Sequence, residues 1–212
     1  IHEKWENDRE SLLRSADEIT ASFNQRQLFS SQADETLLSN ALERYKKTYD
    51  ESCGGFGDAP KFPAPHNLMF LLQQYQKHGD HMALKMAENT LQKMYAGGLF
   101  DHIGYGFYRY STDRFYLIPH FEKMLYVNAL LILAYCKAYM LTGNLLYKKV
   151  SEKTAFYILT EMTAPDGGFY SAQDADSDGE EGKYYTFTPN ETIQLLGPKD
   201  GMVFNNYFGI TS

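Results

Sequence analysis

The sequence predicts an all-α protein built from antiparallel helical hairpins. Apolar residues recur at helical spacing through most of the 212 residues. In three places, at 54–55, 97–98 and 167–168, a pair of glycines followed by an apolar residue ends a helical stretch and begins a polar, aromatic-rich loop. One hairpin cannot bury its apolar face alone, so a recurring unit of this kind indicates an array of stacked hairpins.

The N-terminal part is expected to hold two helices. Apolar residues at helical spacing predict a long amphipathic helix over 3–27 and a second helix over 35–49, with a polar break at 30–34 between them. Residues 54–63 contain three glycines and two prolines, which excludes regular structure from that stretch.

The next two helices have clear start and stop signals. Pro65 suits the first position of a helix that runs to residue 78 and is ended by Gly79. Asp80 is then expected to cap a helix that ends at the second glycine pair. Residues 99–119 hold two aromatic runs around a polar tip, which predicts a short β-hairpin or an extended loop.

The remaining helices differ in how much of their surface is apolar. The helix predicted over 122–141 is apolar nearly all round and should be buried on most sides, whereas the helix over 145–161 has one charged face. An enclosed helix followed by a half-exposed one is the pattern that two concentric layers of helices require. Residues 167–188 form another extended excursion around an acidic tip, and Pro189 begins a short helix to about residue 196.

Composition excludes several classes of partner. The chain is 43% hydrophobic and 22% charged, with a net charge of −7, so nothing in it favours binding to nucleic acid or to an anionic membrane surface. The longest uncharged run, 124–136, is shorter than the roughly 20 residues that a membrane span needs. Cys53 and Cys136 are interpreted as free thiols of a reducing compartment. We expect a cytoplasmic protein whose start, without Met or an apolar leader, is that of a piece of a longer chain.

The loops carry the residues suited to acid/base chemistry, and His120 is the main candidate. Pro119 is expected to fix the start of a helix, which would place His120 and Glu122 in its first turn, as a catalytic pair or simply as a cap. Asp101 and His102 begin the excursion that His120 and Glu122 end. The two pairs would therefore meet at one mouth.

Two kinds of reaction fit these residues. With Asp174 and Asp176 of the acidic tip, carboxylates could flank a glycosidic bond and hydrolyse it. Two histidines on opposite faces of a sugar could instead move a proton at its C2 and epimerise it. Further candidates would bind the substrate, as anchors or aromatic walls: Lys61, Arg109, Phe56, Tyr108, Tyr110 and Tyr116.

No metal or other cofactor is expected. The acidic tip at 174–179 matches the first half of an EF-hand loop, but Tyr185 stands where the bidentate Glu should be. The His120-x-Glu122 pair lacks the cysteine ligands of a zinc deaminase. Gly104 and Gly106 lack the third glycine of a dinucleotide-binding loop.

Three longer motifs resemble those of one family. They are GGFGDAPKFP at 54–63, DHIGYGF through PHFEKMLY at 101–126, and GFYSAQDADS with EGKYY between 168 and 185. Together they are similar to the motifs of the thioredoxin-domain-containing proteins related to spermatogenesis-associated protein 20. The resemblance covers about residues 50 to 197.

The resemblance implies a longer architecture, a thioredoxin-like domain followed by an (α/α)6 toroid similar to that of N-acylglucosamine 2-epimerase, cellobiose 2-epimerase and six-hairpin glycosidases. Residues 1–27 would be the linker helix after the thioredoxin-like domain, and 28–212 the N-terminal portion of the toroid. The expected fold is thus a partial (α/α)6 toroid with short β-hairpin-like loops at one face. Half a ring leaves apolar helix surface unpaired, so self-association is a further expectation.

Three functional hypotheses remain open. The chain would bind or act on a carbohydrate, as a sugar-epimerase-like or glycosidase-like domain. Alternatively, it would be a non-catalytic partner-binding module that works with the thioredoxin-like domain of the same full-length protein. In the third hypothesis the loop charges, such as Asp101 with Arg109 or Glu181 with Lys183, only tie the helix ends together.

Overall fold

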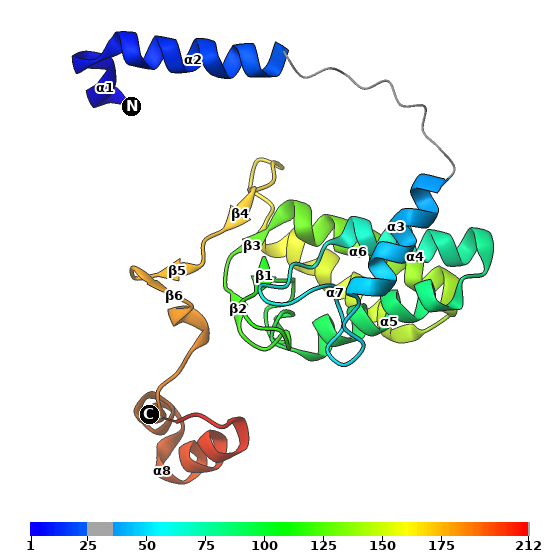
Figure 1. Cartoon of the computed structure of the whole chain (residues 1–212). Helices are drawn as coiled ribbons and strands as arrows, with labels where there is room; N and C mark the ends of the chain where they lie inside the picture. Colours follow the sequence, from blue (N-terminus) through cyan, green and yellow to red (C-terminus); the bar gives the residue numbers. More distant parts are fainter. Residues whose placement is uncertain (25–35, 212) are drawn as a thin grey trace. The chain divides into compact units, whose positions relative to one another are not determined.

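The computed structural model describes residues 1–24 and 36–211, which fall into two units, Ile1–Asn40 and Ala41–Ser212 (Figure 1). The first unit contains helices α1 (His2–Asn7) and α2 (Arg9–Asn24). The single helix predicted from residue 3 is therefore wrong, because Asp8 leaves the helical conformation with φ −154° and ψ 57°. The predicted end of that helix, 25–27, lies outside the described residues.

The second unit is built on two helical hairpins, preceded by α3 (Thr36–Thr48), which begins in the first unit. The hairpins are α4 (Pro65–His78) with α5 (His81–Ala96), and α6 (Leu125–Thr142) with α7 (Leu145–Glu161). The predicted start and stop signals of these helices are confirmed. The Asp80 carboxylate accepts a hydrogen bond from the Ala83 amide at 2.9 Å, and Gly79 ends α4.

The hydrophobic core lies between these helices. α4 packs against both α5 and α6, and α6 packs against α7. Each hairpin thus shares its apolar face with the next, as an array requires. The largest fully buried core residues on the helices are Leu68, Leu71, Leu72, Met86, Tyr135, Tyr147 and Tyr157.

α6 begins later and is less enclosed than the sequence predicts. Its start moves to Leu125 because the two preceding residues, β3 (Lys123–Met124), pair with β4 (Ala172–Gln173). One face of α6 is fully buried, but Leu133 and Met140 on the other are 55% and 81% exposed. Among the described helices, α6 alone has the length and apolar composition to cross a membrane, and a core helix has the same composition.

Three long loops, the first over 49–64, the second over 97–124 and the third over 162–188, emerge at the same end of the hairpins. Figure 1 shows β1, β2 and β3 gathered there. Within the second loop, β1 (Tyr110–Ser111) pairs with β2 (Pro119–His120). The third loop contains the β5 (Asp176–Ser177) and β6 (Glu180–Glu181) hairpin, which is followed by a 3-10 turn, η1 (Lys183–Tyr185). The expectation of short β-hairpin-like loops at one face is confirmed.

A tight hairpin-like turn occurs three times, over 49–56, 100–107 and 163–169. In each, the first and last residues form an antiparallel bridge, and the amide of the second residue donates to the carbonyl of the next-to-last, at 3.0, 3.0 and 2.7 Å. Gly55 therefore corresponds to Gly106, and both have positive φ, 78° and 76°. The glycine pairs predict the position of this repeat incorrectly in its second copy. The pair at 97–98 precedes the turn over 100–107, and the amide of Gly98 donates to the Tyr116 carbonyl.

The last helix, α8 (Pro189–Phe208), is longer than expected. Thr188 and Glu191 form a capping box at its start. The predicted end near residue 196 coincides with a kink at Gly197, where φ is 81°, after which the helix resumes.

Candidate functional site

Three polar clusters lie in the loops at the hairpin ends. The first, the His120 cluster, joins the second loop to the third. Nδ1 of His120 lies 2.5 Å from Glu181 Oε1, and its Nε2 lies 3.7 Å from Glu122 Oε2. Arg109 Nη1 donates to the same Glu122 oxygen at 2.8 Å. The Tyr110 ring stacks on the imidazole with centroids 5.0 Å apart, because the β1–β2 register places the two residues opposite each other.

The chemistry of this cluster follows from the different partners of the two imidazole nitrogens of His120. With the Nδ1 proton donated to Glu181, the lone pair is on Nε2, which is then a proton acceptor. The side chains of His120 and Glu122 remain 22% and 21% exposed, so a ligand can reach them. Such a histidine can take a proton from a substrate and return it.

The second cluster surrounds the buried amine of Lys123. Nζ of Lys123 donates to Asp101 Oδ2 at 2.7 Å and to the Tyr105 carbonyl at 2.9 Å. Three tyrosine rings face this ammonium, with centroids 4.7 to 5.4 Å from Nζ: Tyr108, Tyr157 and Tyr185. We call these five side chains and the carbonyl the Lys123 cluster.

Burial and charge shift the ionisation of this cluster. Burial lowers the pKa of Lys123 below its usual value, although the Asp101 carboxylate opposes that shift. Burial would raise the pKa of Asp101, but its hydrogen bonds with Lys123 and two backbone amides hold it below the usual range. Burial also raises the pKa of Tyr185 to about 12, which keeps its hydroxyl neutral at physiological pH.

A cavity of about 590 Å³ opens beside the Lys123 cluster. Its volume lies in the range of small-molecule sites. Its walls combine charged, polar and aromatic groups from the second and third loops and from α7: Asp101, Ile103, Gly104, Lys123, Tyr157, Glu161, Gln173, Tyr184, Tyr185 and Phe187.

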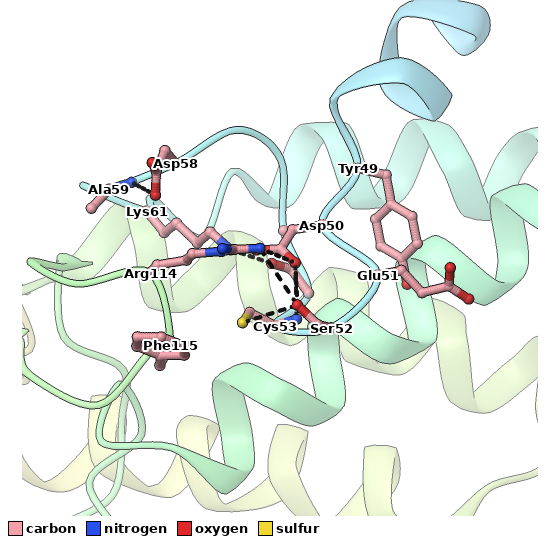
Figure 2. A network of polar contacts seen from close by, with 12 residues as sticks. Tyr49, Asp50, Glu51, Ser52, Cys53, Asp58, Ala59, Lys61, Arg114 and Phe115 are labelled. Atoms are coloured by element: carbon pink, nitrogen blue, oxygen red, sulfur yellow. Dashed lines mark hydrogen bonds and ion pairs between the residues drawn. The ribbon is translucent and has the colours of Figure 1, made fainter.

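The third cluster is centred on Asp50, and Figure 2 shows the side chains of Lys61 and Arg114 converging on its carboxylate. Lys61 Nζ donates to Asp50 Oδ2 at 2.8 Å and to the Gly54 carbonyl at 2.7 Å. Arg114 donates to both carboxylate oxygens, at 2.7 and 3.2 Å, and the Ser52 hydroxyl donates to Oδ1 at 2.8 Å. The hydrogen bonds from Arg114, and then those from Lys61 and Ser52, hold the pKa of Asp50 well below its usual range.

The structure divides the site residues predicted for one mouth among these clusters. His120, Glu122, Arg109 and Tyr110 come together in the first. The carboxylate of Asp101, expected opposite His120, binds Lys123 instead, which also removes the Asp101–Arg109 contact that a scaffold role would use. His102 packs edge-on against the rings of Tyr95 and Phe100.

The other predicted residues lie in packing or turn positions. Asp174 accepts the backbone amide of Asp176 at 3.2 Å within the acidic tip. Tyr108 is 4% exposed and Tyr116 is 1% exposed, so their rings are walls of the core. Phe56 packs against Tyr45 and Tyr49.

The helix-start interpretation of His120 and Glu122 was also wrong. His120 belongs to β2, and Glu122 precedes α6 by three residues. The segment is extended because its residues pair with two different partners, β1 and β4. The dipole of α6 is therefore not the reason for their chemistry.

Sequence reasoning missed Lys123, Asp50 and Arg114, and it did not pair Glu181 with His120. One signal was available: in an extended segment side chains alternate, so His120 and Glu122 share one side while Phe121 and Lys123 share the other. A second signal was the aspartate at the second position of two repeated turns, Asp50 and Asp101.

The fold and the gathered loops define part of an (α/α)6 toroid. The structure matches cellobiose 2-epimerase from Bacillus thermoamylovorans with a TM-score of 0.58 and 18% identity, over 76% of this chain and 48% of that one. It also matches a sugar epimerase from a ruminal bacterium, with a TM-score of 0.55 and 17% identity, over 81% and 53% of the two chains. At this identity the likeness concerns the fold, and it confirms the predicted fold class.

By sequence, the chain is homologous to spermatogenesis-associated protein 20. It is 40% identical to the human protein over 214 residues, which cover 92% of this chain and 27% of the relative. It is 33% identical to the uncharacterized protein B0495.5 of Caenorhabditis elegans, over 94% of this chain and 29% of that protein. The chain thus spans about a quarter of the length of these relatives. No protein-family model matches it.

Proposed function

We propose that the chain is part of a carbohydrate-active domain in which His120 exchanges a proton with a sugar. The observation that supports this most is the 2.5 Å contact between Glu181 and His120 Nδ1. A carboxylate at this nitrogen fixes the ring and its tautomer, so Nε2 is the atom that takes and returns the proton.

The groups beside Nε2 are suited to hold a polar ligand. Glu122, which accepts a hydrogen bond from Arg109, lies next to Nε2 and can also accept a hydrogen bond from a sugar hydroxyl. Among the described side chains, Arg109 Nε is a buried nitrogen without a hydrogen-bond partner. An unpaired buried donor costs about 1–3 kcal/mol, and a functional role is one explanation for retaining it.

Proton transfer at the C2 of an open-chain sugar fits this geometry better than hydrolysis does. A base that removes the proton beside the carbonyl leaves a planar enediol. The configuration at C2 changes when this enediol turns its other face to the base before the proton returns. Hydrolysis needs two carboxylates that flank the bond, but the carboxylate of Asp174 accepts the backbone amide of Asp176 within the acidic tip. Two proteins of the same fold are sugar epimerases, which supports the same choice.

The first experiment is a thermal-shift screen of the full-length protein against monosaccharides and disaccharides. A ligand at 100 times its dissociation constant adds about 2.7 kcal/mol to the free energy of unfolding, so a bound sugar raises the melting temperature by a few degrees. A flat panel would contradict the proposal and favour the alternative, a non-catalytic module that binds a partner together with a thioredoxin-like domain.

The second experiment tests His120 itself. Solvent deuterium should enter the C2 position of the sugar that gives a shift, and proton NMR measures the rate. We expect His120→Asn to lower this rate by about 10²–10⁴-fold, because an acid/base group contributes that much. Unchanged exchange, with an unchanged melting temperature, would remove His120 from the mechanism.

A further inference from the structure

The Lys123 cluster, with its adjoining cavity, carries an inference that involves neither His120 nor Glu181. We infer that Lys123 is a covalent attachment site: its amine condenses with the carbonyl group of a small hydroxyaldehyde in this cavity and forms a protonated imine. The inference goes beyond the proposed function, since it assigns a second site with different chemistry.

The position of Lys123 separates it from an ordinary surface lysine. Its side chain is only 2% exposed, yet it forms part of the wall of the 590 Å³ cavity. The ammonium has two acceptors, Asp101 and the Tyr105 carbonyl, and its remaining surroundings are aromatic rings. An ammonium so placed is held in one orientation, on a side chain that borders the cavity.

The repeated turn supplies an internal comparison. In the turn over 49–56, Lys61 binds Asp50 and the Gly54 carbonyl, and in the turn over 100–107, Lys123 binds the corresponding Asp101 and Tyr105 carbonyl. A structural clamp accounts for both lysines. The two lysines differ in their cavities: Lys123 lines the 590 Å³ cavity, whereas the 480 Å³ cavity beside Asp50 is lined by Asp50 and Arg114 and not by Lys61.

Of the opposing effects on the Lys123 amine, burial is the largest, and it favours loss of the proton. Burial lowers the pKa of Lys123, which enlarges the neutral fraction of its amine relative to that of an exposed lysine. The neutral amine is the nucleophile in imine formation. Asp101 lies 2.7 Å from Nζ, within reach of the proton that must leave.

The reaction balances with the groups present. The ammonium gives one proton to Asp101, and the Nζ lone pair forms a bond to the carbonyl carbon while the C=O π electrons move to oxygen. A proton passes from nitrogen to that oxygen, and Asp101 returns its proton as the hydroxyl leaves as water. Overall, R–CHO and Lys–NH3⁺ give R–CH=NH⁺–Lys and water.

The product suits the cluster as well as the free lysine does. The iminium keeps one positive charge and one N–H, so Asp101 remains its counter-ion. The rings of Tyr108, Tyr157 and Tyr185 remain beside the cation, where their faces stabilise it. In the rest of the cavity, Glu161 and Gln173 can bind hydroxyl groups, and Tyr184 and Phe187 offer apolar faces. These walls fit a short polyhydroxylated chain.

Reductive trapping tests the inference without a mutation. The full-length protein is incubated near neutral pH with glyceraldehyde and sodium cyanoborohydride, which reduces an iminium to a stable secondary amine, and the modified lysines are mapped by mass spectrometry. We expect Lys123 to be labelled several-fold faster than Lys149, which is exposed, and than Lys61, which is buried. Labelling of Lys123 no faster than that of Lys149, or equal labelling of Lys61, would overturn the inference.

Two variants sharpen the result. Asp101→Asn enlarges the neutral fraction of the Lys123 amine, but it removes the group that takes and returns the proton. Labelling of Lys123 should therefore fall several-fold in protein whose circular dichroism shows that it is folded. Undiminished labelling in that variant would contradict the role of Asp101. His120→Asn should leave the labelling of Lys123 unchanged, so the imine site and the proposed sugar reaction fail or succeed separately.

Discussion

At the scale of single residues, the two buried lysines of the loops each form an ion pair with an aspartate. Asp50 pairs with both Lys61 and Arg114, and Asp101 pairs with Lys123. Both lysine side chains are almost completely buried, at 1% and 2% exposed. A charge in such a position is stable only with its partner, since its desolvation is otherwise uncompensated.

Asp50→Asn should therefore be strongly destabilising. The change leaves the Lys61 ammonium buried without a counter-charge, and breaking a buried pair in this way costs about 3–5 kcal/mol. Chemical denaturation measures the free energy of unfolding. As a control, Lys85→Ala removes the exposed pair with Glu51 and should leave stability unchanged. A loss at Asp50 no larger than at Lys85 would contradict this account.

The same residue predicts how stability depends on pH. Because the folded-state pKa of Asp50 lies well below its unfolded value, the contribution of Asp50 is fully present above about pH 4 and is lost as the pH falls further. We expect the free energy of unfolding to decrease below about pH 4 in the natural protein. The Asp50→Asn variant should show a shallower decrease over the same range, and equal slopes would count against the prediction.

At the scale of elements, the repeated turn lies at the start of each long loop at the end of the hairpins. Each copy folds back after a returning helix by the same two backbone contacts, and two copies carry an aspartate that a distant lysine binds. In the copies over 49–56 and 100–107, the next-to-last residue has positive φ, a conformation that glycine adopts without strain.

Gly106→Ala should destabilise the protein more than Gly57→Ala does. Both glycines have φ of 76°, so each substitution strains the backbone by about 1–2 kcal/mol. A Cβ at Gly106 would also overlap the ring of Tyr157, whereas one at Gly57 meets nothing within 4 Å. Overpacking adds about 1–3 kcal/mol. Thermal unfolding of the two variants compares them, and equal losses would show that Tyr157 moves aside freely.

At the scale of the whole molecule, the chain is a portion of a ring with unpaired apolar surface. It covers 48% of the cellobiose 2-epimerase chain that it matches, and one side of α6 is apolar and exposed. In a toroid, such a surface is covered by the neighbouring hairpin. In the 212-residue chain alone, it is available to another copy of the same chain.

We therefore expect the 212-residue chain alone to self-associate in solution. Light scattering coupled to gel filtration should give a mass above that of one chain, and the double substitution Leu133→Glu with Met140→Glu should lower it. Lys149→Glu, on α7, is the control and should not change the mass. A monomeric natural chain would contradict the expectation.

The sequence by itself determined the helical hairpins. Pro65, Gly79 and Asp80 act on the few residues around them, so α4, α5 and α7 appear where their local signals predict. The longer motifs also predicted the toroid, which the structural likeness confirms. Local capping and backbone preferences are short-range effects, and they can be read without knowing what lies across the fold.

Only the tertiary structure decided how the loop residues combine. Glu181 meets His120 from 61 residues away, and pairing of Lys123–Met124 with β4 delays the start of α6. The same alternation that exposes His120 buries Lys123 beside Asp101. Contacts between loops depend on how the hairpins stack, and a charged side chain that is buried takes the nearest partner that compensates its desolvation. Which partner is nearest depends on distances in the folded structure, and these distances cannot be read from the order of residues along the chain.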